Sequence, residues 1–260
     1  MYDIVSLTRC YERVESLERA LQQSVIDMPK EGISVMNVLI LDRLTPEVRA
    51  IVDKYSGYDN VLVSEEVEGT DPNSFVRNRA ALNRGLRAFD ASGTQAKWVW
   101  LHDDDQILDS RYKEHLRAYL DMPGILALEL VSLFVWNEDE DNPLVNLNQH
   151  NRSPQISRYL KGHRWPEDER QIHCTKQVQT KILRNPYRGK TLPFYIIDYG
   201  ATNAEFREKM ARVQIKDFRS TQYNRAWTEK PTLARLCDVI RELTPIELTT
   251  KQLKARGMFK

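Results

Sequence analysis

The sequence predicts an α/β fold, a single domain whose mostly parallel central sheet carries helices on both faces, followed by an irregular, basic C-terminal part. Two observations support this prediction. Short apolar runs alternate with amphipathic segments along the first 136 residues, and such alternation is typical of parallel sheets. One of these runs, Lys97–Leu101, leads into three consecutive carboxylates, Asp103–Asp105, which a buried strand can accommodate only at its end.

The strands of the first half are expected where β-branched, aromatic and other apolar residues gather in short runs. These runs are Asp3–Leu7, Ser34–Leu41, Asn60–Ser64, Lys97–Leu101 and Ile125–Trp136. Between them, apolar residues recur at helical spacing and predict the helices Glu12–Ser24, Thr45–Tyr55, Phe75–Phe89 and Ser110–Leu120. Thr45 suits the cap of its helix and Pro46 the first turn. Trp98 and Trp100 are expected to pack in the core.

The acidic stretch Glu138–Asp141, with Asn142 and Pro143 after it, interrupts this alternation and opens a longer, less regular region. Within it, Phe194–Ile197 predicts one more strand. Three further segments predict helices: Ala204–Met210, Lys230–Arg241 and Ile246–Arg256.

Charge is divided unevenly along the chain, although the net charge of the 260 residues is only +1. Residues 1–150 hold 15 Lys and Arg against 26 Asp and Glu, whereas residues 151–260 hold 23 against 11. A polarised chain of this kind indicates that the basic part meets an anionic partner. The alternative is that the two halves neutralise each other in the folded protein.

Composition narrows the class of protein. The chain is 41% hydrophobic and 29% charged, as is typical of globular proteins, and its longest apolar stretch is interrupted by Glu129. The N-terminus enters a strand-like segment without a signal peptide. Three cysteines, far apart and odd in number, suit a reducing compartment and form no zinc motif. These features predict a cytoplasmic protein.

The acidic triplet Asp103–Asp105 is the strongest candidate site. Clustered carboxylates at a strand end suit Mg²⁺ or Mn²⁺, which bind one or two carboxylates together with substrate phosphates. No P-loop and no dinucleotide-binding glycine motif is present, so phosphates would be held by metal and cationic side chains. The alternative is a solvated, Asp-rich turn.

Four segments, in order, resemble motifs of GT-A fold nucleotide-sugar glycosyltransferases, in particular the broad family-2-like group. They are Ile4–Arg13, Val38–Asp42, Phe75–Leu86 and His102–Asp105. The first is similar to that family's first strand and loop, and the second to its second strand with a terminal acid. The third resembles its Ala-Arg-Asn-x-Gly helix, and the fourth its D-x-D motif. The resemblance covers about residues 2–136, with weaker similarity to about residue 240.

This resemblance implies a nucleotide-sugar-binding, Rossmann-like half over residues 1–136 and an acceptor-binding basic half over residues 137–260, within one continuous domain. The implied donor is a nucleoside-diphosphate sugar, a UDP-sugar first of all, used with Mn²⁺ or Mg²⁺. The implied nucleotide-sugar ligands are Thr8, Arg9, Asp42, Arg77, Asp103 and Asp104. Asp103 and Asp105 are the implied metal ligands. Because His102 stands where many relatives have an acid, a register centred on Asp104 stays open.

The catalytic base is less clear from the resemblance. An inverting transfer needs a carboxylate to take the proton of the acceptor hydroxyl. Glu229 lies in a segment similar to the family's Glu-Asp motif, although Lys230 replaces the Asp, and Asp198 at the end of a predicted strand is the rival base. Glu167 and Asp168 match by letters but precede the acceptor-side segment Gly200–Arg207, which is the wrong order. Whether the transfer inverts or retains therefore stays open.

The basic half suggests an anionic acceptor. The favoured one is a hydroxymethylated base in DNA, as in phage-type DNA glycosylation, with Trp165 or Trp227 supporting an extruded base. A phosphate-rich cell-envelope glycan or a lipid-linked intermediate is the alternative acceptor. His163 or His173 could be a further metal ligand, although a lone histidine is more often structural. Two other classes of function stay open, a metal-dependent nucleotidyltransferase and a non-catalytic binding protein on the same scaffold.

Overall fold

The computed structural model describes residues 1–10, 13–42, 44–64, 74–137, 139, 141–162, 164, 189–202 and 231–248. The chain forms two compact units that each draw on separate stretches of sequence. Unit 1 comprises Met1–Asp105, Lys113–Glu129 and Ser153–Lys190, and unit 2 comprises Gln106–Tyr112, Leu130–Arg152 and Thr191–Lys260. None of the helices formed by the described residues is long and apolar enough to cross a membrane.

Unit 1 is an α/β unit, as predicted. Its strands are β1 (Tyr2–Cys10), β2 (Val35–Leu41), β3 (Val61–Ser64) and β4 (Ala96–Asp103), in the order β3-β2-β1-β4. The three pairings among them are all parallel. Its helical segments are α1 (Val14–Leu21), the π-helix η1 (Gln22–Asp27), α2 (Met28–Lys30), α3 (Pro46–Ser56) and α4 (Ser74–Ala91). Helix α5 (Tyr112–Leu120) belongs to this unit from Lys113 onward.

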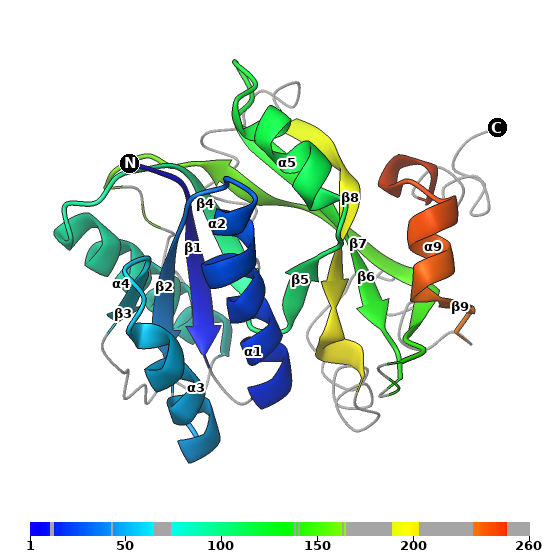
Figure 1. Cartoon of the computed structure of the whole chain (residues 1–260), viewed down its shortest axis with the longest axis horizontal. Coiled ribbons are helices and arrows are strands. Elements are labelled where there is room, and N and C mark those ends of the chain that lie inside the picture. The colour runs from blue at the N-terminus through cyan, green and yellow to red at the C-terminus, as the bar shows by residue number, and fades with distance from the viewer. Residues whose placement is uncertain are drawn as a thin grey trace. The chain divides into compact units, whose positions relative to one another are not determined.

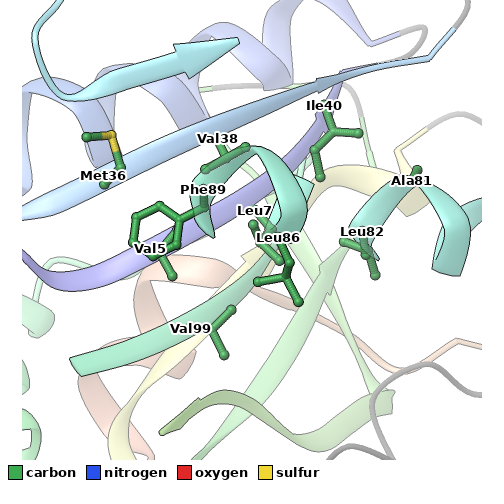
Figure 2. Close-up of a cluster of buried hydrophobic side chains, with 10 residues drawn as sticks. All are labelled: Val5, Leu7, Met36, Val38, Ile40, Ala81, Leu82, Leu86, Phe89 and Val99. Carbon is green, nitrogen blue, oxygen red and sulfur yellow. The ribbon is translucent and has the colours of Figure 1, made fainter. Parts of the chain in front are cut away.

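The two faces of the unit 1 sheet bury different helices (Figure 1). Successive side chains of a strand point to opposite faces. In β2, Met36, Val38 and Ile40 therefore pack against α4, whereas Leu39 and Leu41 pack against α1 and α3. Figure 2 shows the α4 cluster, in which Phe89 is completely buried beside β1 and β2. The expected helices on both faces are thus confirmed.

Local details explain two of the boundaries. The first helical region continues past the expected end at Ser24, because η1 follows α1 directly and its carbonyl groups find side-chain donors. Asn37 Nδ2 donates to Ser24 O at 3.3 Å, and Asn60 Nδ2 donates to Val25 O at 3.0 Å. Thr45 caps α3 as predicted, since its Oγ1 accepts a hydrogen bond from Val48 N at 3.3 Å.

Unit 2 contains antiparallel strands. They are β5 (Gln106–Leu108), β8 (Gly189–Asp198) from Thr191 onward and β9 (Leu233–Arg235), with the parts of β6 (Ala127–Val135) and β7 (Leu144–Arg158) that fall in this unit. The order is β7-β6-β8-β5, and β9 pairs with β7. The 3₁₀ turn η3 (Tyr199–Ala201) follows β8, and α9 (Leu236–Glu242) follows β9. Apolar residues of β6, β8 and α9 form its core.

Two expectations for the second half were wrong in detail. The region after the acidic stretch contains the long strand β7, which polar residues such as Asn146 and Gln155 hide from an apolar-pattern search, although both are buried. The expected helix Lys230–Arg241 begins only at Leu236, because residues 233–235 pair with β7. The expected helix Ala204–Met210 lies outside the described residues, as does the end of Ile246–Arg256. The proposed functional division at residue 136 stays a prediction.

Candidate functional site

The candidate site lies at the carboxyl edge of the parallel strands of unit 1. Because β1, β2 and β4 run in the same direction, their carboxyl ends meet at one edge, where ligands bind in open α/β sheets. Arg9 of β1 is the direct neighbour of Asp103 of β4. Asp42 follows β2, and its backbone N donates to Cys10 O at 3.2 Å. The structure thus brings Arg9, Asp42 and Asp103 to one edge.

The acidic triplet ends β4 and turns the chain. Asp103 is the last residue of the strand and is exposed, whereas Asp105 is only 9% exposed. Although Asp103 meets solvent, neighbouring protein atoms desolvate its carboxylate and raise its pKa, against the opposing charges of Arg13 and Arg9. Burial raises the pKa of Asp104 to about 7, and the charge of Asp103 adds to the rise. Burial thus disfavours the charged form of Asp103 and Asp104, and a nearby positive charge would favour it.

Two arginines of the β1–α1 region meet the acids of this edge. Arg9 donates from Nε to Asp42 Oδ2 at 2.6 Å, and its Nη2 lies 2.6 Å from the same oxygen. Arg13, the residue before α1, forms an ion pair between its Nη1 and Oδ2 of Asp105. Asp42 is completely buried, so the Arg9 pair compensates a carboxylate that water does not reach.

His102 stands just before the triplet and anchors it to the core. Its ring is 1% exposed and stacks on Trp100, with ring centroids 3.9 Å apart. Its Nδ1 lies 3.2 Å from Ser6 Oγ and 3.3 Å from Thr8 Oγ1. Thr8 is itself completely buried, so its hydroxyl serves this network in the structure. The expected core packing of Trp100 is confirmed, and it fixes the backbone from which Asp103 projects.

The remaining predicted site residues fall elsewhere. Arg77 lies in α4, and its side chain is outside the described part of the chain, as is Glu229. Asp198 ends β8 in unit 2 and is 7% exposed. Its Oδ1 accepts from Gly200 N at 2.8 Å and its Oδ2 from Gln106 Nε2 at 2.9 Å. Asp198 thus caps η3, and a role as base would require one of these oxygens to be shared.

Asp103 and Asp105 are the side chains of unit 1 that a divalent cation bound with a diphosphate could use. Nowhere in the described parts of the chain do three or more His, Cys, Asp or Glu side chains form a cage for a metal ion. Two carboxylates are nevertheless enough for Mg²⁺ or Mn²⁺ when phosphate oxygens and water complete the shell. The guanidinium group on Asp105 shows that this carboxylate already holds a cationic group.

The sequence predicted no role for Arg13, and it assigned Thr8 to the nucleotide and not to a network with Ser6 and His102. The signal for the network was the alternation of polar Ser6 and Thr8 with apolar residues in the first strand, which places both hydroxyls on one face. The contact of Arg13 could not be predicted in this way, because Arg13 lies between the first strand and α1, where no repeating pattern of apolar residues indicates which way a side chain points.

No known family model and no curated protein sequence matches the chain. Solved structures with some similarity include three crystal structures of residues 1–349 of TarS from S. aureus, two of which are complexes with UDP-GlcNAc and with UDP. The structure without a named ligand is 17% identical to this chain, with a TM-score of 0.49. The UDP-GlcNAc complex is 16% identical, with a TM-score of 0.48, and the UDP complex is 17% identical, with a TM-score of 0.47. The alignments with these three structures, taken in the same order, cover 82%, 82% and 85% of this chain. They cover 64%, 66% and 68% of the TarS chains. At this level of likeness, the function has to be argued from the site itself.

Proposed function

We propose that the protein is a metal-dependent glycosyltransferase, which moves a sugar from a nucleoside-diphosphate sugar to a hydroxyl group of an anionic acceptor. The observation that carries this proposal is the exposed Asp103 at the carboxyl edge of parallel strands, beside Asp104 and Asp105 and within reach of two arginines. Excess carboxylates attract a divalent cation, and the arginines attract phosphate. The same edge therefore suits both charges of a metal–diphosphate pair.

Asp103 and Asp105 are the residues that would hold Mn²⁺ or Mg²⁺. When bound, the cation neutralises charge that develops on the leaving diphosphate. Asp42, which is completely buried beneath its pair with Arg9, would accept a hydrogen bond from the nucleotide base once Arg9 shifts part of its contact from Asp42 to the nucleotide. Arg77, Thr8 and Asp104 are proposed as further nucleotide ligands on the strength of the family resemblance. Thr8 is completely buried, so its hydroxyl would have to leave His102 to reach the nucleotide.

The catalytic base is proposed to be Asp198 or Glu229. Asp198 is a buried carboxylate at a strand end, and its hydrogen bonds from Gly200 N and Gln106 Nε2 fix its orientation. A fixed carboxylate is suited to accept a proton from one positioned hydroxyl group. Substitution of each acid by its amide distinguishes the two: the base variant loses transfer but keeps donor binding.

The favoured acceptor is a hydroxymethylated base in DNA. The excess of basic residues in residues 151–260 supports an anionic polymer, because Lys and Arg neutralise phosphates. A phosphate-rich cell-envelope glycan or lipid-linked glycan has the same charge. The choice between them depends on direct transfer assays.

The experiment is a transfer assay with UDP-sugars and Mn²⁺, in which duplexes with and without hydroxymethylated bases are compared by intact-mass measurement. The proposal expects the hydroxymethylated duplex alone to gain the mass of one sugar per modified base, with release of UDP, and Asp103→Asn to abolish the gain. Release of pyrophosphate instead would indicate a nucleotidyltransferase. Absence of transfer to the DNA and to phosphate-rich glycans, with any nucleotide sugar, would contradict the proposal.

A further inference from the structure

Arg13 is the cationic residue that most directly opposes the charge of the acidic triplet. It forms the ion pair with Asp105, and its positive charge opposes the rise in pKa of Asp103 and of Asp104 more strongly than that of Arg9 does. Arg13 thus contacts Asp105 from a position directly before α1.

The guanidinium of Arg13 and a divalent cation would compete for the same oxygen. The ion pair uses Oδ2 of Asp105, which is one of the two carboxylates proposed to hold the metal. A cation arriving alone would have to displace Arg13 or lie beside it, and like charges in a partly buried place repel strongly. The Arg13 side chain is 31% exposed, so it has room to leave Asp105 for another anion.

A diphosphate is the anion that could release Arg13. Guanidinium groups bind phosphate through two parallel hydrogen bonds as readily as they bind carboxylate. We infer that Arg13 exchanges between Asp105 and the diphosphate of the nucleotide, and thereby makes binding of the metal depend on binding of the nucleotide. This inference rests on the proposed donor site at the acidic triplet, and it adds to that site a residue that couples its two ligands.

The test measures binding directly, by calorimetric titration of the full chain with Mn²⁺ alone, UDP alone, and Mn²⁺ in the presence of saturating UDP. In Arg13→Gln, Mn²⁺ alone binds about tenfold more tightly than in the wild type, and the factor by which UDP strengthens Mn²⁺ binding falls about tenfold. Arg19→Gln is the control, because it removes one positive charge from the last turn of α1 and keeps Arg13, the partner of Asp105, and it leaves both quantities unchanged.

Arg13→Lys separates charge from structure. A lysine keeps the positive charge beside Asp105 but lacks the forked geometry, so Mn²⁺ alone binds as weakly as in the wild type while UDP binds less tightly. A merely structural role would make this variant resemble Arg13→Gln in both titrations. Uridine, which has no diphosphate, leaves Mn²⁺ binding by the wild type unchanged.

Two outcomes distinguish this inference from the proposed function. If the wild type binds Mn²⁺ and UDP together but Arg13→Gln shows the same affinities and coupling, the inference is wrong and the donor site stands. If the wild type binds no nucleotide with or without Mn²⁺, the donor site itself is wrong, and the inference with it. Should Arg13→Gln not fold, wild-type binding of Mn²⁺ alone that is as tight as with UDP overturns the inference.

Discussion

Asp3 joins three parts of unit 1 through one carboxylate. Ser34, before β2, donates to its Oδ2 from the backbone N at 3.0 Å and from Oγ at 2.7 Å. Arg117 of α5 donates to Oδ1 at 2.9 Å and to Oδ2 at 2.8 Å, and Lys97 Nζ lies 3.3 Å from Oδ1. Asp3 is 7% exposed, so water cannot replace these donors. We therefore expect Asp3→Asn to destabilise the protein.

The magnitude follows from the number and charge of these bonds. A hydrogen bond to a charged group contributes about 1.5–3 kcal/mol and a neutral one about 1 kcal/mol. The amide keeps the shape, but only its oxygen can accept hydrogen bonds, because its NH2 group is a donor like Ser34 and Arg117. The bonds to the oxygen that becomes NH2 are lost, and those to the remaining oxygen fall to the weaker class. Arg117, 38% exposed, is then partly solvated by water. The free energy of unfolding should fall by about 2–3 kcal/mol at pH 7.

The effect depends on pH with a definite sign. Burial alone would raise the pKa of Asp3, but the hydrogen bonds from Arg117 and Ser34 outweigh it and hold that pKa well below its ordinary value. A carboxylate with a lowered folded-state pKa stabilises the protein fully above its unfolded pKa of about 3.9, and this stability is lost as the pH falls toward the folded value. The difference between wild type and Asp3→Asn should therefore be constant above about pH 5 and shrink below about pH 4.

Urea unfolding followed by tryptophan fluorescence at pH 7 and at pH 3 measures both quantities. Asp121→Asn is the matched control, since Asp121 is 52% exposed and meets Lys97 and Arg117 only at 3.8 and 3.9 Å. It should cost less than about 0.5 kcal/mol. A loss for Asp3→Asn below about 0.5 kcal/mol at pH 7, or one as large at pH 3 as at pH 7, would refute the reasoning.

Two other positions of unit 1 give sharp expectations in the same assay. A Cβ on Gly85 would lie 2.6 Å from Ile40 Cδ1 and 2.8 Å from Ile40 Cγ1, so Gly85→Ala should destabilise by about 1–3 kcal/mol. Ile40→Val removes the nearer of these atoms and should reduce part of the cost; purely additive effects would contradict this. Arg9→Gln should lower the free energy of unfolding by about 3 kcal/mol, because the completely buried Asp42 loses its ion pair. Adding Asp42→Asn to this variant should recover part of that loss. A cost below about 1 kcal/mol for Arg9→Gln would show that the pair contributes little.

The parallel half of the fold was predictable because its segments differ clearly in pattern. The buried run of β2 and the helical spacing of α3 each bury a continuous apolar face, and sequence shows such faces directly. Strand β7 escaped prediction because it is held by pairing with its neighbours, and its polar residues carry no period. Edge strand β9 is too short to show any pattern, so a helix was expected to begin before it.

The site was predictable only as far as strand ends determine it. Consecutive carboxylates after an apolar run must leave the core, and Asp103 does emerge at the end of β4. The partner of Asp105 could not be predicted, because Arg13 is 92 positions away in sequence and lies outside any regular strand. Likewise, a strand-end acid such as Asp198 can either cap a turn or take a proton, and only its hydrogen bonds reveal that it caps η3.

The most direct test of the donor site is a thermal-shift titration with UDP, with Mn²⁺ and with both. A ligand that binds only the folded state stabilises it by about 2.7 kcal/mol at a hundred times its Kd, so the melting temperature should rise clearly. The account predicts a rise that needs UDP and Mn²⁺ together and disappears in Asp103→Asn and Asp105→Asn, but not in Asp121→Asn. A full rise in Asp103→Asn, or no rise with any nucleoside diphosphate, would contradict it.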